Sequence, residues 1–186
     1  YLPLWGMIHR GGGNMLSKKL LGALNQQIND EYYSSYIYQS MVAYFEDLNL
    51  DGSAHWMKMQ AEEEHLHALK IFNYVVERGG RVELFAVPKP PMEWDSPRAA
   101  FEAALEHEKL MTEKISKLAD LAIEERDHAT NNLMQWYVSE QVEEEANVDD
   151  ILKKLDLMGD SGTGLFLMDR ELKSRPAPAP IDVEGI

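Results

Sequence analysis

Residues 61–69 read Ala61-Glu62-Glu63-Glu64-His65-Leu66-His67-Ala68-Leu69, with three carboxylates and two imidazoles in six positions. Most runs of charge in helical sequences form solvated faces, so a site requires evidence that some of these side chains point inward. Positions seven apart lie on nearly the same line of an α-helix. Glu64 has Met57 seven residues before it and Ile71 seven residues after it, so it is predicted to lie on the buried face.

The other charged residues of this stretch face in different directions. His67 lies one helical turn beyond Glu64 on the same face, and Tyr74 follows His67 at a spacing of seven. Glu62 is predicted to point to solvent, roughly 200° away from Glu64, and His65 lies on a flank. One metal-binding spacing, Glu64-x-x-His67, is therefore predicted to point into the protein.

Three other helical segments repeat this pattern of a glutamate in the middle of an apolar stripe. The glutamates and the apolar residues seven before and after them are Glu31 with Leu24 and Tyr38, Glu108 with Phe101 and Ile115, and Glu144 with Tyr137 and Ile151. Two like charges 4 Å apart repel by about 4 kcal/mol at an effective dielectric of 20, and each buried ion costs several kcal/mol in desolvation. No nearby Lys or Arg is predicted to be buried, so a pair of divalent metal ions is the expected counter-charge.

Turn residues divide the chain into five predicted helices, which cover residues 16–48, 53–78, 97–125, 128–158 and 163–174. Ser53, Ser96 and Asp127 are the predicted N-caps, and Gly79 with Gly80 is predicted to end the second helix. About 15 residues join the second helix to the third, enough to span about 50 Å. The predicted fold is therefore an all-α four-helix bundle with one long crossover and a short C-terminal fifth helix.

The two ends of the sequence differ in composition from the helical part. Gly11-Gly12-Gly13 makes residues 1–14 look like an N-terminal extension or linker, and the Pro/Ala-rich residues 175–186 form a predicted extended tail. The domain is expected to cover residues 15–174.

The net charge of −14 argues against nucleic acid or an anionic membrane as a partner. The chain has no cysteine, which excludes thiolate sites and fits a cytoplasmic location.

Several long motifs are more distinctive than the spacing alone. They are NDEYYSSYIYQSM (29–41), HWMKMQAEEEHLHALK (55–70), YVVERGGRVEL (74–84), EHEKL (106–110) and LMQWYVSEQVEEE (133–145). With these motifs, residues 15–175 resemble bacterial and archaeal non-haem ferritins. The arrangement of two helices with Glu and a Glu-x-x-His motif is itself known from di-iron carboxylate bundles.

The resemblance implies roles for individual residues. Glu31, Glu64 and His67 would hold a first iron, and Glu64, Glu108 and Glu144 a second, with Glu64 bridging. Gln141 would lie beside the pair, Glu63, Glu140 and Glu143 would form a third, inward-leading iron site, and Tyr38 and Trp136 match aromatic residues near the centre. Each assignment has a simpler alternative: Tyr38 and Trp136 as core packing, Glu140 and Glu143 as a wet face, and Gln141 as a plain helix former.

The resemblance also implies a function. The expected activity is ferroxidase: Fe(II) is oxidised to Fe(III) by O₂ at a dinuclear centre, and the Fe(III) is stored as a mineral. Iron storage would require a homo-oligomeric shell, which the family builds from twenty-four subunits. The ten methionines read as core filling, and no haem is expected.

Three alternatives remain open. A rubrerythrin-like di-iron peroxidase would normally have a second Glu-x-x-His and often a cysteine-bearing module, whereas this chain has Glu144-x-x-Asn147 and no cysteine. A bacterioferritin would also be expected to have the histidine that Asn147 replaces. A DNA-protecting mini-ferritin or a metal-free bundle would not be expected to keep four centred glutamates. The terminal segments also leave open a cage used to display a peptide, which would not alter the site.

Overall fold

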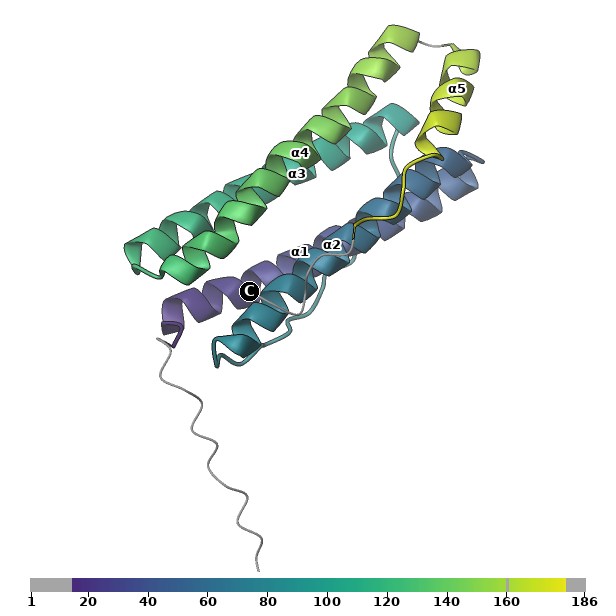
Figure 1. The fold of residues 1–186 in the computed structure, drawn as a ribbon. Helices are drawn as coiled ribbons and strands as arrows, with labels where there is room; N and C mark the ends of the chain where they lie inside the picture. The colour runs from purple at the N-terminus through teal and green to yellow at the C-terminus, as the bar shows by residue number, and fades with distance from the viewer. Residues whose placement is uncertain (1–14, 160, 180–186) are drawn as a thin grey trace, which may run out of the picture.

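The computed structural model describes residues 15–159 and 161–179, which form five α-helices and no strand (Figure 1). The helices are α1 (Lys18–Asp47), α2 (Asp51–Glu77), α3 (Pro97–Glu124), α4 (His128–Met158) and α5 (Gly162–Leu172). α1 packs against α2 and α3 against α4, as two helical hairpins, and α1 also contacts α3. The short α5 lies across one end of the bundle, against α2 and α4. This is the predicted four-helix bundle with a fifth helix.

The connection between α2 and α3 runs along α1, which fixes the direction of the second hairpin. Near the start of α1, the Asn25 side chain donates to the Arg81 carbonyl (3.1 Å) and accepts from the Glu83 amide (3.2 Å). Near its end, the Tyr44 hydroxyl donates to the Trp94 carbonyl (3.0 Å). The connection thus travels the length of α1, and the predicted long crossover is confirmed.

Local sequence accounts for most helix ends. The side chains of Ser96 and Asp127 accept hydrogen bonds from the amides of Ala99 (3.1 Å) and Thr130 (3.0 Å), so both predicted N-caps are confirmed. Gly79 has φ 72°, a conformation that favours glycine, and it follows the last turn of α2 as predicted.

The predicted N-cap at Ser53 is wrong. α2 begins two residues earlier, at Asp51, and its N-cap Leu50 makes no side-chain hydrogen bond. The carboxylate of Asp169 on α5 serves instead, because it accepts from the amides of Gly52 (3.0 Å) and Ser53 (2.7 Å). An anionic group at a helix N-terminus is favourable, so a remote side chain supplies this cap.

The hydrophobic core falls into two clusters, one toward each end of the bundle. The first includes Phe45, Met57, Phe101 and residues of α5; the second includes Leu24, Ile71, Ile115 and Met134. The predicted carboxylates lie at sequence positions between these clusters in all four long helices. None of the helices in the described ranges is long and apolar enough to span a membrane.

Candidate metal centre

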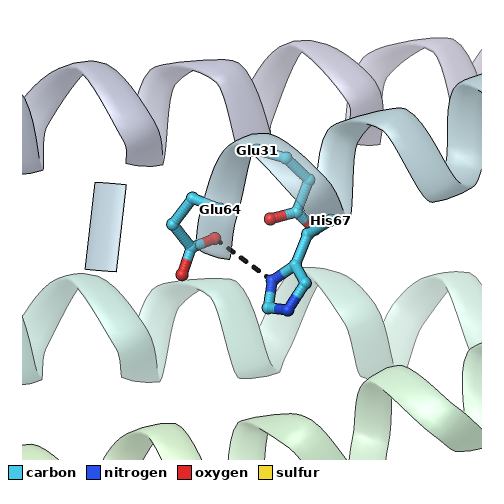
Figure 2. Close-up of side chains that lie close together, drawn as sticks. All are labelled: Glu31, Glu64 and His67. Atoms are coloured by element: carbon cyan, nitrogen blue, oxygen red, sulfur yellow. Dashed lines mark ion pairs between the residues drawn. The ribbon is translucent and has the colours of Figure 1, made fainter. Parts of the chain in front are cut away.

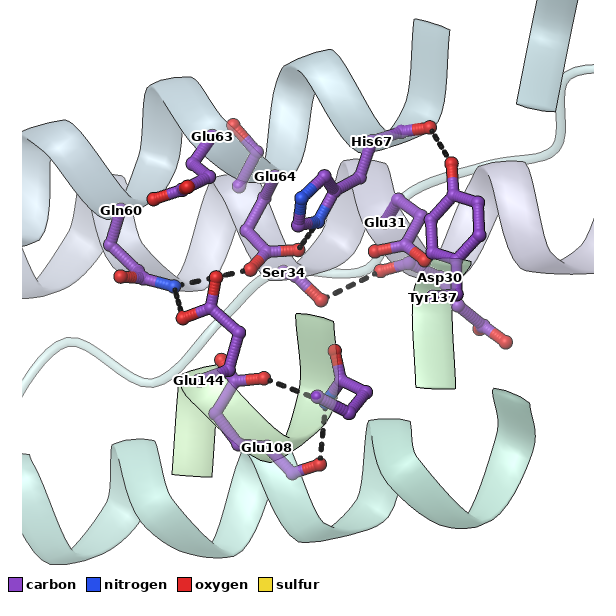
Figure 3. Close-up of polar contacts among 12 residues, drawn as sticks. Asp30, Glu31, Ser34, Gln60, Glu63, Glu64, His67, Glu108, Tyr137 and Glu144 are labelled. Atoms are coloured by element: carbon purple, nitrogen blue, oxygen red, sulfur yellow. Dashed lines mark hydrogen bonds and ion pairs between the residues drawn. The ribbon is translucent and has the colours of Figure 1, made fainter. Parts of the chain in front are cut away.

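Four glutamates, one from each long helix, converge in the layer between the two apolar clusters (Figure 3). Glu31, Glu64, Glu108 and Glu144 have only 1–2% of their surface exposed. Their apolar neighbours at a spacing of seven are also buried, as the stripes predicted. The four-helix geometry therefore gathers four carboxylates in the interior, where a positive charge is needed to offset their mutual repulsion.

The buried ligands form two groups that share Glu64. Glu31, Glu64 and His67 offer ligand atoms that all lie within 4.8 Å of one another, and so do Glu64, Glu108 and Glu144. Figure 2 shows the first group, with Nδ1 of His67 3.4 Å from Oε2 of Glu64. A shared carboxylate between two groups is the arrangement that would place two cations side by side.

His67 has an unused buried nitrogen. Its Nε2 atom has no hydrogen-bond partner among the described residues, although the side chain is only 1% exposed. The residue is held by its surroundings: the Tyr137 hydroxyl donates to its backbone carbonyl (2.7 Å), and Trp136 meets its ring edge-to-face at 5.5 Å. A buried imidazole without a full set of partners is unfavourable, and it fits a residue that binds a cation.

Neighbouring polar groups hold the carboxylates in place. Gln27 donates to Glu31 (2.8 Å), and Gln60 donates to both Glu64 (3.3 Å) and Glu144 (2.5 Å). The fourth carboxylate, Glu108, accepts from the Tyr38 hydroxyl and from Gln141 (3.2 Å). These amide and hydroxyl donors stabilise the charged form of each carboxylate and fix its direction.

Burial nevertheless raises the pKa of all four carboxyl groups. Desolvation is the largest cause in each case. The Glu64 charge further raises the pKa of Glu31 and Glu144, and Glu108 does the same to Glu64. Without a cation the cluster therefore tends to hold protons, which metal binding would release.

The remaining predicted residues lie at different depths around this centre. Glu62 is exposed, as predicted, and His65, which the sequence placed on a flank, is exposed as well. Glu63 is half-buried and can join His67 and Glu144 in a third group within 4.8 Å. Glu140 is half-buried and Glu143 exposed on the neighbouring face of α4. Burial, followed by the charges of Glu143 and Glu63, raises the pKa of Glu140, although neither α4 residue completes a ligand group among the described residues.

Sequence reasoning missed two kinds of residue at the centre. Gln60, four positions before Glu64, could have been placed on the buried stripe by its spacing. Arg175 could not, because it lies in the segment expected to be an extended tail. Its guanidinium contacts Glu63 and Gln60 (2.8 and 2.7 Å), so a positive charge that the sequence did not predict lies beside the cluster, although it bonds to none of the four centred glutamates.

Comparison with known proteins agrees with this geometry. The family model described as ferritin-like domain matches residues 21–158. A bacterial non-heme ferritin of Bacteroides fragilis is 40% identical over 161 residues, 87% of this chain and 100% of the relative. A probable bacterial non-heme ferritin-like protein of Haemophilus influenzae is also 40% identical, over 85% of this chain and 96% of that protein.

Solved structures of archaeal ferritins have the same fold. The open pore ferritin of Archaeoglobus fulgidus is 52% identical with a TM-score of 0.86, over 87% of this chain and 98% of that one. A closed form of the same ferritin, engineered by mutagenesis, is 51% identical with a TM-score of 0.86, over 88% and 99%. With the fold, four centred glutamates and the family match in agreement, the chain belongs to the ferritin family and is similar to its bacterial and archaeal non-haem members.

Proposed function

We propose that the protein oxidises Fe(II) with O₂ at a dinuclear centre and stores the resulting Fe(III) inside an oligomeric shell. The observation that carries this proposal is the pair of buried ligand groups, Glu31–Glu64–His67 and Glu64–Glu108–Glu144, joined through Glu64. Membership of the ferritin family supports iron as the metal. Carboxylate-rich sites with one imidazole suit Fe(II), and hard anionic ligands favour the higher charge of Fe(III).

Two adjacent Fe(II) ions make a two-electron reaction possible. Each ion gives up one electron, and one O₂ with two protons becomes hydrogen peroxide, so that no superoxide need be released. The residues of the chain hold the substrate ions side by side and exclude bulk water, because the centre lies between two apolar clusters. The carboxyl groups that lose protons on binding Fe(II) are a local source for the protons that O₂ consumes.

Residues around the pair take supporting roles in this proposal. Tyr38 and Gln141 both donate to Glu108, so they orient the ligand that belongs to the second ion alone. Glu63, with Glu140 and Glu143, would form a third iron site on the side of α2 and α4. Oxidised iron would leave the centre past these carboxylates toward the storage space.

The test is aerobic addition of Fe(II) to the purified protein, followed by absorbance and particle size together. Oxidation well beyond two irons per subunit, ending as ferric mineral within particles of unchanged size, is the expected result. A loading of about ten irons per subunit, then desalting and Mössbauer spectroscopy, distinguishes the alternative. A stable dinuclear signal without mineral would identify a di-iron redox enzyme and overturn the storage function.

A further inference from the structure

Arg175 lies beside the candidate centre, although it follows the last helix of the chain. Its side chain is only 16% exposed, and its guanidinium stacks over the Trp56 ring with Cζ 4.4 Å from the ring centroid. Nη1 donates to the Trp56 carbonyl (3.3 Å) and to Oε1 of Gln60 (2.7 Å), while Nη2 donates to Oε2 of Glu63 (2.8 Å). This number of directed contacts indicates a fixed position rather than a loose surface pairing.

The backbone around Arg175 is held as well. His55 on α2 contacts the Arg175 carbonyl through Nε2 (2.9 Å), and the Arg175 amide donates to the Leu172 carbonyl at the end of α5 (3.2 Å). Arg175 is therefore tied to α5 on one side and to α2 on the other. The guanidinium is delivered to the same place in each folded chain.

The two polar side chains that Arg175 contacts both lead to the centre. Gln60 uses its amide nitrogen for Glu64 and Glu144 and its oxygen for Arg175. Glu63 belongs to the third ligand group, with His67 and Glu144. A cation bound by that group would take a Glu63 oxygen and would meet a positive charge already bonded to the same carboxylate.

We propose that Arg175 is a resident counter-ion of Glu63, which a cation must displace in order to bind the Glu63–His67–Glu144 group. This inference rests on the proposed function and deepens it, because it assigns control over the Glu63–His67–Glu144 group to the segment after α5. In the metal-free protein Arg175 compensates the Glu63 charge and steadies Gln60. Removal of the guanidinium should therefore strengthen cation binding at this third group most, whereas the first two groups, which do not contain Glu63, should change much less.

The experiment titrates Zn²⁺, which does not change oxidation state, into the metal-free assembled protein by calorimetry. The wild type should bind two Zn²⁺ per subunit tightly and a third more weakly. Arg175→Gln should tighten the third by about tenfold or more, and Arg175→Lys should fall between, because lysine keeps the charge and loses the planar fork. Lys173→Gln is the matched control, since Lys173 pairs with Asp51 at an exposed position (3.3 Å) in the same segment.

A second variant ties the effect to Glu63. In a Glu63→Gln background, Arg175→Gln should no longer change Zn²⁺ binding, because the pairing is already lost. An unchanged third affinity in Arg175→Gln, or a weaker one, would overturn the inference while two tight sites still support the ferroxidase centre. Absence of the two tight sites in the wild type would instead overturn the proposed function. Should Arg175→Gln not assemble, Arg175→Lys decides by the same comparison.

Discussion

Glu64 is the side chain on which both buried ligand groups depend. Glu64→Ala or His67→Ala should lower the rate of Fe(II) oxidation by about 100-fold or more, because either change leaves an under-ligated ion beside buried carboxylates. The measurement is the initial rate of ferric absorbance after anaerobic loading and mixing with air. Glu62→Ala and His65→Ala are matched controls, since both side chains are exposed on the same helix.

The histidine pair gives the sharper comparison. His65 and His67 differ by two positions and point to opposite environments, one exposed and one buried. Greater damage from His65→Ala than from His67→Ala would contradict the assignment of the inward face of α2, whatever the absolute rates.

Glu144 illustrates how the centre lowers the stability of the metal-free protein. Burial, then the charges of Glu64 and Glu108, raises its pKa well above 4.5. The folded protein therefore favours the protonated carboxyl group of Glu144. Below the unfolded pKa the group is protonated in both states and stability is retained, and this stability is lost as pH rises through the folded pKa. Glu144→Gln should therefore raise the Tm of the metal-free protein by a few degrees at pH 7 and leave it nearly unchanged near pH 4. Calorimetric Tm values at both pH values test this, and a lower Tm at pH 7 would contradict it.

For individual residues, the sequence predicted which side chains point into the bundle better than it predicted which side chains contact one another. The spacing of seven placed Glu31, Glu64, Glu108 and Glu144 correctly, because a straight helix conveys inward direction by periodicity alone. It could not show that Arg175 turns back to Glu63, since no periodic pattern extends past the end of α5. Roles at the centre beyond this placement remain predictions.

At the scale of whole helices, the contact of Asp169 with the start of α2 joins α5 to the first hairpin. Asp169→Ala removes acceptors for two amides and should cost about 1–2 kcal/mol, or roughly 3–6 °C in Tm for a chain of this size. Differential scanning calorimetry measures the change. Glu171→Ala is the control, because that side chain pairs with Lys154 at an exposed position; equal losses in the two variants would argue against a capping role.

A second link joins the end of α2 to the start of α4. Nη1 and Nη2 of Arg78 donate to the Asp127 carboxylate (2.9 and 2.7 Å), and this pairing is the main cause that lowers the pKa of Asp127 from 3.8 to about 2. The contribution to stability is present above pH 3.8 and is lost as pH falls through about 2.

Asp127→Asn keeps an N-cap side chain but removes the charge of this pair. It should lower Tm at pH 6, where the loss is about 1 kcal/mol, and the difference from wild type should shrink at pH 3. Thermal melts followed by circular dichroism at the two pH values are the measurement. Asp156→Asn, on an exposed pair with Arg98, is the control, and a difference independent of pH would contradict the linkage.

The N-caps of α2, α3 and α4 show what residue order alone can predict and what it cannot. Ser96 and Asp127 cap the helices that directly follow them, so local residue order was sufficient. The start of α2 is capped by Asp169, more than a hundred positions away, and only the tertiary fold brings that carboxylate to it. The long crossover could be predicted because the reach of a connection depends on the number of residues in it.

For the chain as part of an assembly, α5 leaves apolar side chains uncovered. Phe166 and Leu167 are 62% and 55% exposed, while Met168 and Leu172 on the same helix are buried against the bundle. A storage role requires an enclosed volume, so we expect a particle of several hundred kilodaltons in which these side chains are covered. Light scattering in ordinary buffer measures the mass, and monomers or dimers alone would contradict a closed shell.

The crossover between the two hairpins also sets an order of events during synthesis. Chains emerge from the ribosome with the N-terminal part first, so α1 and α2 bring out Glu31, Glu64 and His67 before any residue of the second hairpin exists. Glu108 and Glu144 follow only after the crossover has been made. An unfinished chain can thus gather the Glu31–Glu64–His67 group but not the Glu64–Glu108–Glu144 group, and a lone Fe(II) supplies a single electron. Under the proposed function, two-electron reduction of O₂ therefore requires both hairpins and can begin only after the crossover has been made.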